Sequence, residues 1–68
     1  MRTWLKNLRD KNSLTQLEMS KKLDISESYY NLIENGERQK DLDLSLVKKL
    51  AELFDVSVEW IAEQEKER

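Results

Sequence analysis

The 68-residue chain contains no cysteine, no histidine, no proline and a single glycine, Gly36. The absence of cysteine and histidine excludes zinc sites of the common Cys/His kinds, a disulfide framework, and catalysis by a thiol or an imidazole. One glycine also excludes glycine-rich phosphate loops and dinucleotide fingerprints, because both need several glycines at fixed spacing. We therefore predict a protein that is not an enzyme, with no catalytic residue, no cofactor, no metal and no small-molecule ligand.

Long hydrophobic runs are also missing. No apolar segment approaches the roughly 18 residues that cross a bilayer, and Lys6 and Arg9 interrupt the region where a signal peptide is apolar. We therefore expect a cytoplasmic protein without a membrane partner. A chain of this length forms one small domain that buries about 60% of the surface its unfolded form exposes, so its stability should be modest.

Apolar residues recur at spacings of three and four, which predicts amphipathic helices rather than strands. These apolar stripes lie at Leu5 and Leu8; Met19 and Leu23; Tyr30 and Ile33; Leu44, Val47, Leu50, Ala51 and Phe54; and Val58 and Ile61. They predict an all-α fold of five short helices within one domain, residues 1–62. Residues 63–68 are expected to be a charged C-terminal tail that frays.

Polar residues with a preference for helix ends separate the stripes. Thr15 and Glu18 have the T-x-x-E spacing of a capping box, and Ser26 is a natural first cap for the next helix. Asn35-Gly36 is the clearest stop, because glycine accepts the left-handed conformation that ends a helix. The fourth and fifth helices are assigned caps at Asp43 or Ser45 and at Ser57.

Residues 16–35 contain two capped helices joined by a break of about three residues. Helices joined by so tight a turn cross steeply and need a small residue where they approach, a role that Ser20 fits. This arrangement is a helix-turn-helix, whose second helix is suited to the DNA major groove. Spacing alone leaves open both DNA binding and a helix pair with a purely structural role.

The string Leu14-Thr15-Gln16-x-x-Met19-Ser20-x-x-Leu23-Asp24-Ile25-Ser26 resembles the Leu-Thr-Gln-x-x-Leu-Ala-x-x-Leu-Gly-Ile-Ser pattern of the Cro/CI-type (XRE, lambda-repressor-like) helix-turn-helix family. The similarity extends over roughly residues 2–62. It implies a compact five-helix domain that binds double-stranded DNA sequence-specifically. It further implies a bacterial or phage-type transcriptional regulator, expected to be a repressor that acts as a homodimer on a palindromic operator.

The resemblance also implies roles for individual positions. Base contacts are expected from the front of the recognition helix, at Ser26, Glu27, Ser28, Asn31 and Leu32. Contacts to the DNA backbone are expected from Gln16, Tyr29, Asn35, Arg38 and Lys40. Arg9 and Glu34 match a pair that forms a structural salt bridge between the first and third helices, and Tyr30 occupies a core position.

Several of these residues have an ordinary alternative role. Gln16 suits the first turn of any helix, and Glu27 is favoured there by the helix dipole. The Tyr29 hydroxyl either bonds a phosphate or remains in water, and Leu32 either contacts a thymine methyl or is a stray exposed residue. The chain also departs from the family pattern: Asp24 replaces the usual glycine of the turn, the usual proline before the fourth helix is absent, and the loop after Gly36 is about two residues longer.

The net charge of −2 is the sum of opposed segments. Residues 1–22 carry six basic and two acidic side chains, and residues 38–49 carry four basic and two acidic. Residues 23–37 carry four acidic side chains and no basic one. Because the binding of a phosphate depends on the local electrostatic field and not on the net charge of the chain, the two basic segments are compatible with DNA binding. The acidic Glu27 and the apolar Leu32 favour the alternative, a protein-binding regulator of the same fold (antirepressor, antitoxin-like or oligomerisation module).

Overall fold

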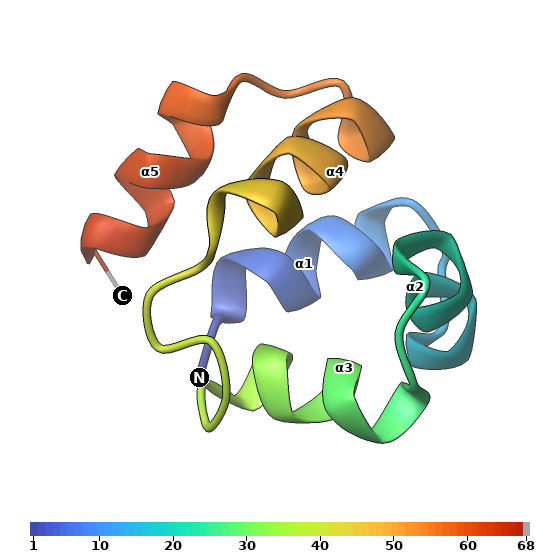
Figure 1. The fold of residues 1–68 in the computed structure, drawn as a ribbon. Coiled ribbons are helices and arrows are strands. Elements are labelled where there is room, and N and C mark those ends of the chain that lie inside the picture. Colours follow the sequence, from blue (N-terminus) through green and yellow to red (C-terminus); the bar gives the residue numbers. More distant parts are fainter. Residues whose placement is uncertain (68) are drawn as a thin grey trace.

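Five helices follow one another in residues 1–67, the part of the chain that the structure, a computed structural model, describes. They are α1 (Thr3–Lys11), α2 (Gln16–Leu23), α3 (Glu27–Asn35), α4 (Leu44–Phe54) and α5 (Val58–Glu67). In Figure 1, α4 and α5 lie on the upper side, α3 on the lower side, and α1 runs between them. The all-α, five-helix prediction is confirmed. No helix among these residues is long and apolar enough to span a membrane.

Helices α2 to α5 begin where local capping predicts, whereas α1 has no side-chain cap. In the capping box of α2, the Thr15 hydroxyl accepts the Glu18 N–H at 3.1 Å, and the Glu18 carboxylate accepts the Thr15 N–H at 2.9 Å. The hydrogen bond from the Thr15 backbone lowers the pKa of Glu18. Three more side chains cap helices by a single hydrogen bond, accepting N–H groups of Tyr29, Leu46 and Trp60: Ser26 (3.1 Å), Asp43 (2.8 Å) and Ser57 (2.9 Å).

Three helices end at a residue in the left-handed region. Gly36 ends α3 at φ 81°, where glycine has no steric penalty. Asp24 ends α2 at φ 58° and ψ 46°, and Asp55 ends α4 at φ 55°. Residues other than glycine adopt this conformation only at some cost in free energy, which both aspartates incur. The turn of the helix-turn-helix therefore has a left-handed residue at the position where the family pattern has glycine.

All five helices contribute to one core. Its buried apolar side chains are Leu5, Met19, Leu23, Tyr30, Ile33, Leu46, Leu50 and Ile61. Ser20 is 2% exposed, and its carbonyl accepts the Ile25 N–H at 2.9 Å, so a small residue does lie where the chain turns from α2 toward α3. The stripe predicted for α4 is partly wrong, because Leu44 in the first turn is 62% exposed and Leu46 is buried instead.

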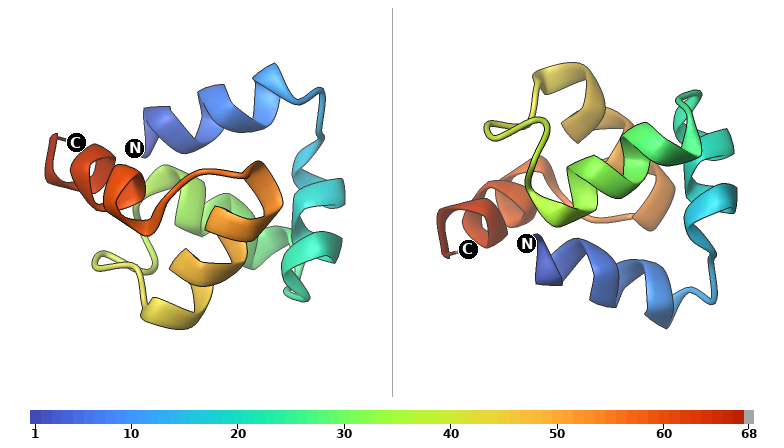
Figure 2. Two further views of the ribbon diagram at one scale, coloured as in Figure 1. Left: turned by 90° about the horizontal axis from the view of Figure 1, so that it is seen from above. Right: turned by 90° about the horizontal axis from the view of Figure 1, so that it is seen from below.

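Helix α5 extends further than the sequence predicts. The predicted tail at residues 63–68 is helical as far as Glu67, and Arg68 lies outside the described residues. Figure 2 shows this end of α5 beside the start of the chain. There Glu65 accepts hydrogen bonds from Arg2 Nε (3.0 Å) and Trp4 Nε1 (2.8 Å). These tertiary contacts hold a charged segment whose composition alone indicates fraying.

Candidate nucleic-acid interface

The helix-turn-helix brings the predicted base contacts together on one face. A shallow hollow in the surface between α2 and α3 is lined by Gln16, Glu27, Ser28, Asn31 and Leu32. Ser26 lies at the edge of this group, exposed, as the first cap of α3. The structure thus places four of the five predicted base-contact residues beside Gln16, the residue expected at a phosphate. We call these five hollow-lining residues the recognition face.

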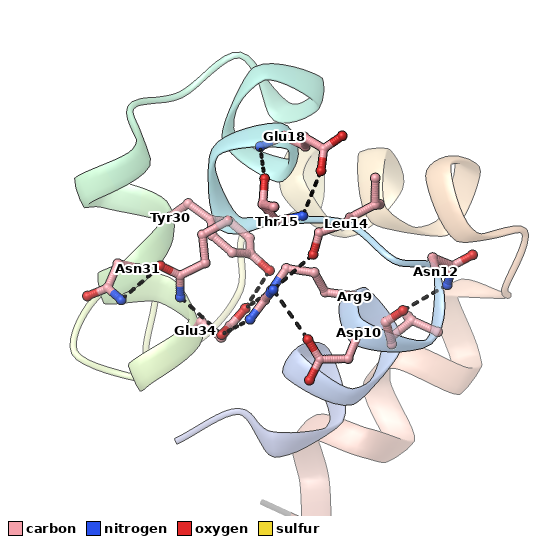
Figure 3. Close-up of polar contacts among 11 residues, drawn as sticks. Arg9, Asp10, Asn12, Leu14, Thr15, Glu18, Tyr30, Asn31 and Glu34 are labelled. Atoms are coloured by element: carbon pink, nitrogen blue, oxygen red, sulfur yellow. Dashed lines mark hydrogen bonds and ion pairs between the residues drawn. The ribbon is translucent and has the colours of Figure 1, made fainter.

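A buried carboxylate lies directly behind the recognition face. Glu34 is 1% exposed, and its Oε2 lies 2.9 Å from Arg9 Nε, so the two residues form the ion pair that the family resemblance implies (Figure 3). Arg9 Nη2 also donates to Glu34 Oε1 at 3.1 Å. The Tyr30 hydroxyl donates to Oε2 at 2.8 Å and Gln16 Nε2 to Oε1 at 3.2 Å. One carboxylate therefore joins α1, α2 and α3.

These contacts fix the charge of Glu34. Burial raises the pKa of Glu34, but hydrogen bonds from Arg9, Tyr30 and Gln16 outweigh burial and leave that pKa below its ordinary value. Burial and the hydrogen bond to Glu34 raise the pKa of Tyr30, and the same carboxylate raises the pKa of Arg9. At neutral pH Glu34 is consequently an anion that only accepts hydrogen bonds, from a neutral tyrosine and a cationic arginine.

A chain of side-chain amides leads from Glu34 to the surface. Because the carboxylate only accepts, the Gln16 amide must point its nitrogen toward Glu34 and its oxygen away. That oxygen accepts Asn31 Nδ2 at 3.2 Å, and Asn31 Oδ1 in turn accepts Asn35 Nδ2 at 3.2 Å. The donor and acceptor ends of three predicted DNA contacts are therefore set in advance by one buried anion.

The loop between α3 and α4, residues 36–43, carries two of the predicted contacts to the DNA backbone. Arg38 and Lys40 are both exposed. Tyr29 is half-buried against the core, and its hydroxyl accepts Gln39 Nε2 at 2.7 Å, while Gln39 Oε1 accepts the Asp43 N–H at 3.1 Å. The Tyr29 hydroxyl thus holds the loop, a role that neither alternative considered from the sequence describes.

Arg2 is a structurally important residue that the sequence pattern does not predict. Its side chain is fully buried, and its backbone N–H donates to the Glu34 carbonyl at 2.8 Å. Burial is predicted from the spacing of apolar residues, and a charged residue just before the first helix is not part of that spacing. The sequence therefore does not predict that Arg2 is buried. The one related local signal is that α3 has no basic residue in its own last turn, where carbonyl groups favour a cation.

Comparison of the sequence with known proteins identifies its family. The sequence model described as Helix-turn-helix matches residues 5–61. HTH-type transcriptional regulator PrpR of Mycobacterium tuberculosis (strain ATCC 25618 / H37Rv) is 38% identical over 58 residues, which cover 85% of this chain and 12% of that protein. "Uncharacterized HTH-type transcriptional regulator YqaF" of Bacillus subtilis (strain 168) is 42% identical over 52 residues, or 76% of this chain. No solved structure matches the chain with significance.

The residues that match the family model include most of the five-helix fold. The aligned part of the chain spans 66% of the length of YqaF and a small fraction of PrpR. Residues 5–61 include nearly all of α1, the whole helix-turn-helix and α4, and the first turn of α5. Residues 14–26, which carry the motif, all lie within them. The chain therefore belongs to the XRE-type helix-turn-helix family of DNA-binding transcriptional regulators, whose members are not enzymes.

Proposed function

We propose that this chain binds double-stranded DNA sequence-specifically and acts as a repressor of bacterial or phage type. The observation that carries the proposal is the recognition face, whose amide groups are oriented by the buried Glu34. Orientation before binding reduces the entropy lost when side chains meet base edges. A helix pair with only a structural role has no need of such a chain of polar groups leading to its surface.

In this proposal α3 enters the major groove with its first turn toward the bases. Glu27 accepts a hydrogen bond from a cytosine amino group, and Leu32 contacts a thymine methyl. Ser26, Ser28 and Asn31 complete the base contacts. The positions proposed to hold the DNA backbone on either side are Gln16, Tyr29, Asn35, Arg38 and Lys40. Lys21 and Lys22, in the last turn of α2, add positive charge to the helix-turn-helix.

We further propose that two copies bind a palindromic operator. The domain measures 26 × 24 × 20 Å, less than the roughly 34 Å of one DNA turn, so a single copy reads only a few base pairs. Large exposed apolar side chains on α4 and α5 are available for contact between copies: Leu44, Val58 and Trp60. In Figure 1 these helices lie on the upper side and α3 on the lower side, so a contact through α4 and α5 leaves α3 free.

Selection from a random DNA pool, followed by affinity measurements on the enriched duplex, tests the proposal. The wild-type chain should enrich a palindrome, and its affinity should fall steeply with salt because phosphate contacts release counterions. Glu27→Lys should lose preference for that duplex over a mixed-sequence one while its affinity for the mixed sequence holds or rises. Glu63→Lys makes the same charge change at an exposed position of α5 and should keep the preference. Failure to enrich any sequence would overturn the proposal.

A protein-binding regulator of the same fold is the second candidate. The observation that favours it is Glu27, an exposed anion in the first turn of α3 and on the recognition face, where DNA presents phosphates. If the recognition face binds a protein instead, Glu27→Lys should change neither sequence preference nor salt dependence. The same variant should then weaken capture of the protein partner that co-purifies with the wild-type chain.

A further inference from the structure

The start of the chain contacts the loop between α3 and α4 through Arg2. The Arg2 guanidinium, fully buried, donates from Nη1 to the carbonyls of Ile33 (2.6 Å) and Arg38 (3.2 Å). From Nη2 it donates to the carbonyls of Gln39 and Lys40, the latter at 3.3 Å. Three successive carbonyls of the loop, residues 38–40, are therefore bound by one side chain.

A carboxylate on α5 completes the arrangement. Arg2 Nε donates to both oxygens of Glu65, at 3.1 and 3.0 Å, and Trp4 Nε1 donates to Glu65 Oε2 at 2.8 Å. All five N–H groups of the guanidinium consequently have acceptors, which is what a buried arginine requires. We call Arg2, Glu65 and Trp4 the loop clamp. In Figure 1 the start of the chain, the loop and the end of α5 lie together at the lower left of the molecule.

The loop has reasons to need such a clamp. Residues 37–43 carry three acidic and two basic side chains, so a loop free to rearrange brings more negative than positive charge to a phosphate. Gln39 is held at φ 53°, a conformation that disfavours residues other than glycine. The loop therefore depends on outside contacts to keep one conformation, and only a fixed conformation reliably presents Arg38 and Lys40.

We propose that Arg2 is a positioning residue for DNA binding, itself positioned by Glu65. By holding the carbonyls of residues 38–40, the loop clamp sets where Arg38 and Lys40 meet the DNA backbone, and it makes α5 part of the DNA-binding machinery. This inference rests on the proposed function, because it assigns the clamp a role in contacts that the proposal places in the loop.

Glu65→Gln and Glu63→Gln form the matched pair that tests it. Both changes remove one negative charge from α5, so both raise long-range attraction to DNA alike, but only Glu65 belongs to the loop clamp. The probes are the duplex selected by the wild-type chain and a mixed-sequence duplex of the same length. Each phosphate contact adds about 0.9 to the slope of log affinity against log salt, or about 3.5-fold between 50 and 200 mM.

We expect Glu65→Gln to bind the selected duplex about 3- to 10-fold more weakly than Glu63→Gln. Its affinity should also depend less steeply on salt, with a slope smaller in magnitude by about 1. Arg2→Lys, whose ammonium has three donors in place of five, should act in the same direction. In a background with Arg38→Ala and Lys40→Ala, the difference between the two glutamine variants should disappear, because the contacts that the clamp positions are gone. Circular dichroism melts establish a temperature at which every variant is folded.

A purely structural clamp predicts something else. Glu65→Gln and Arg2→Lys then lower the melting temperature but, while folded, show the salt slope and affinity of Glu63→Gln, and this result overturns the inference. Failure of the proposed function is distinct, because the wild-type chain then binds neither duplex with a salt-dependent affinity. If Arg2→Lys does not fold, the comparison of the two glutamine variants still decides.

Discussion

Glu34 shows how much one side chain does in a chain this short. Its carboxylate accepts hydrogen bonds from α1, α2 and its own helix, and it orients the amides of the recognition face. Removing one partner of a buried ion pair leaves the other without compensation, which destabilises the folded state strongly. Glu34 therefore links the stability of the domain to the surface that we propose binds DNA.

Glu34→Gln should lower the free energy of unfolding by about 2 to 4 kcal/mol at neutral pH, toward the lower end for a buried pair because Arg9 is partly exposed. The pKa of Glu34 is lowered in the folded state, so its contribution is fully present above the ordinary glutamate pKa and is lost as pH falls through the lowered one. Urea unfolding at pH values from 7 to 3 should show the difference from wild type shrinking with acidity. A difference that stays constant over this range contradicts the assignment, and Glu52→Gln, at an exposed site, is the control.

At the same scale, local signals in the sequence were sufficient for the caps but not for the contacts. Thr15, Glu18 and Ser26 act within four residues of themselves, so their roles follow from spacing. Arg2 and Glu65 are 63 positions apart and both charged, and no pattern of apolar residues indicates that they meet in a buried site. The Gln16 side chain is half-buried and bonded to Glu34 and Asn31, which its predicted role in phosphate binding does not reveal.

At the scale of elements, the turn between α2 and α3 determines how the recognition helix is presented. Asp24 occupies it in a left-handed conformation and also places a negative charge at the negative end of the α2 dipole. Both effects are unfavourable, yet the turn retains the spacing of the motif. The family pattern predicted this geometry correctly despite the substitution, because the backbone requirement can be met by aspartate at a modest cost.

Asp24→Gly should therefore stabilise the domain, by about 0.5 to 1 kcal/mol, equivalent to a rise of roughly 2 to 8 °C in melting temperature for a domain this small. Asp24→Asn removes the charge but keeps a side chain that tolerates the left-handed region, so it separates the dipole contribution from the backbone contribution. Thermal melts of the three proteins measure both. A lower melting temperature for Asp24→Gly means that the aspartate side chain makes a stabilising contribution that outweighs its conformational cost.

Predictions for whole elements were better in the middle of the chain than at its ends. Helices α2 and α3 have caps at both ends and a shared core, so their bounds follow from local sequence. The end of α5 was predicted from its charge to be a tail, and its helical state depends on Arg2 and Trp4 from the other end of the chain. Contacts between distant parts of the sequence decide such segments, and composition does not show them.

At the scale of the whole molecule, the separation of faces matters most. The recognition face belongs to α2 and α3, whereas α4 and α5, which carry further exposed apolar side chains, lie on the upper side of Figure 1, opposite α3. A second copy can thus approach without covering the residues proposed to bind DNA. The distance between two recognition faces then determines which spacing of half-sites a pair can bind.

Insertion of about five base pairs between the half-sites of the selected palindrome should abolish cooperative binding, because half a helical turn places the second half-site on the opposite face of the duplex. Affinity should fall to that of a duplex with one intact half-site. Gel-shift titrations of the palindrome, the spaced duplex and the single half-site make the comparison. Equal affinity for all three contradicts a dimer on a palindrome while leaving DNA binding by one copy intact.

The loop clamp also has a spectroscopic consequence. The two tryptophans of the chain, Trp4 and Trp60, lie edge to face with ring centroids 5.9 Å apart, and Trp4 donates to the clamp carboxylate of Glu65. Intrinsic tryptophan emission consequently samples the corner where α1 and α5 meet and has no reporter on α2 or α3. A change in tryptophan fluorescence therefore reports separation of α1 from α5. Intrinsic fluorescence from α3 can come only from Tyr29 and Tyr30.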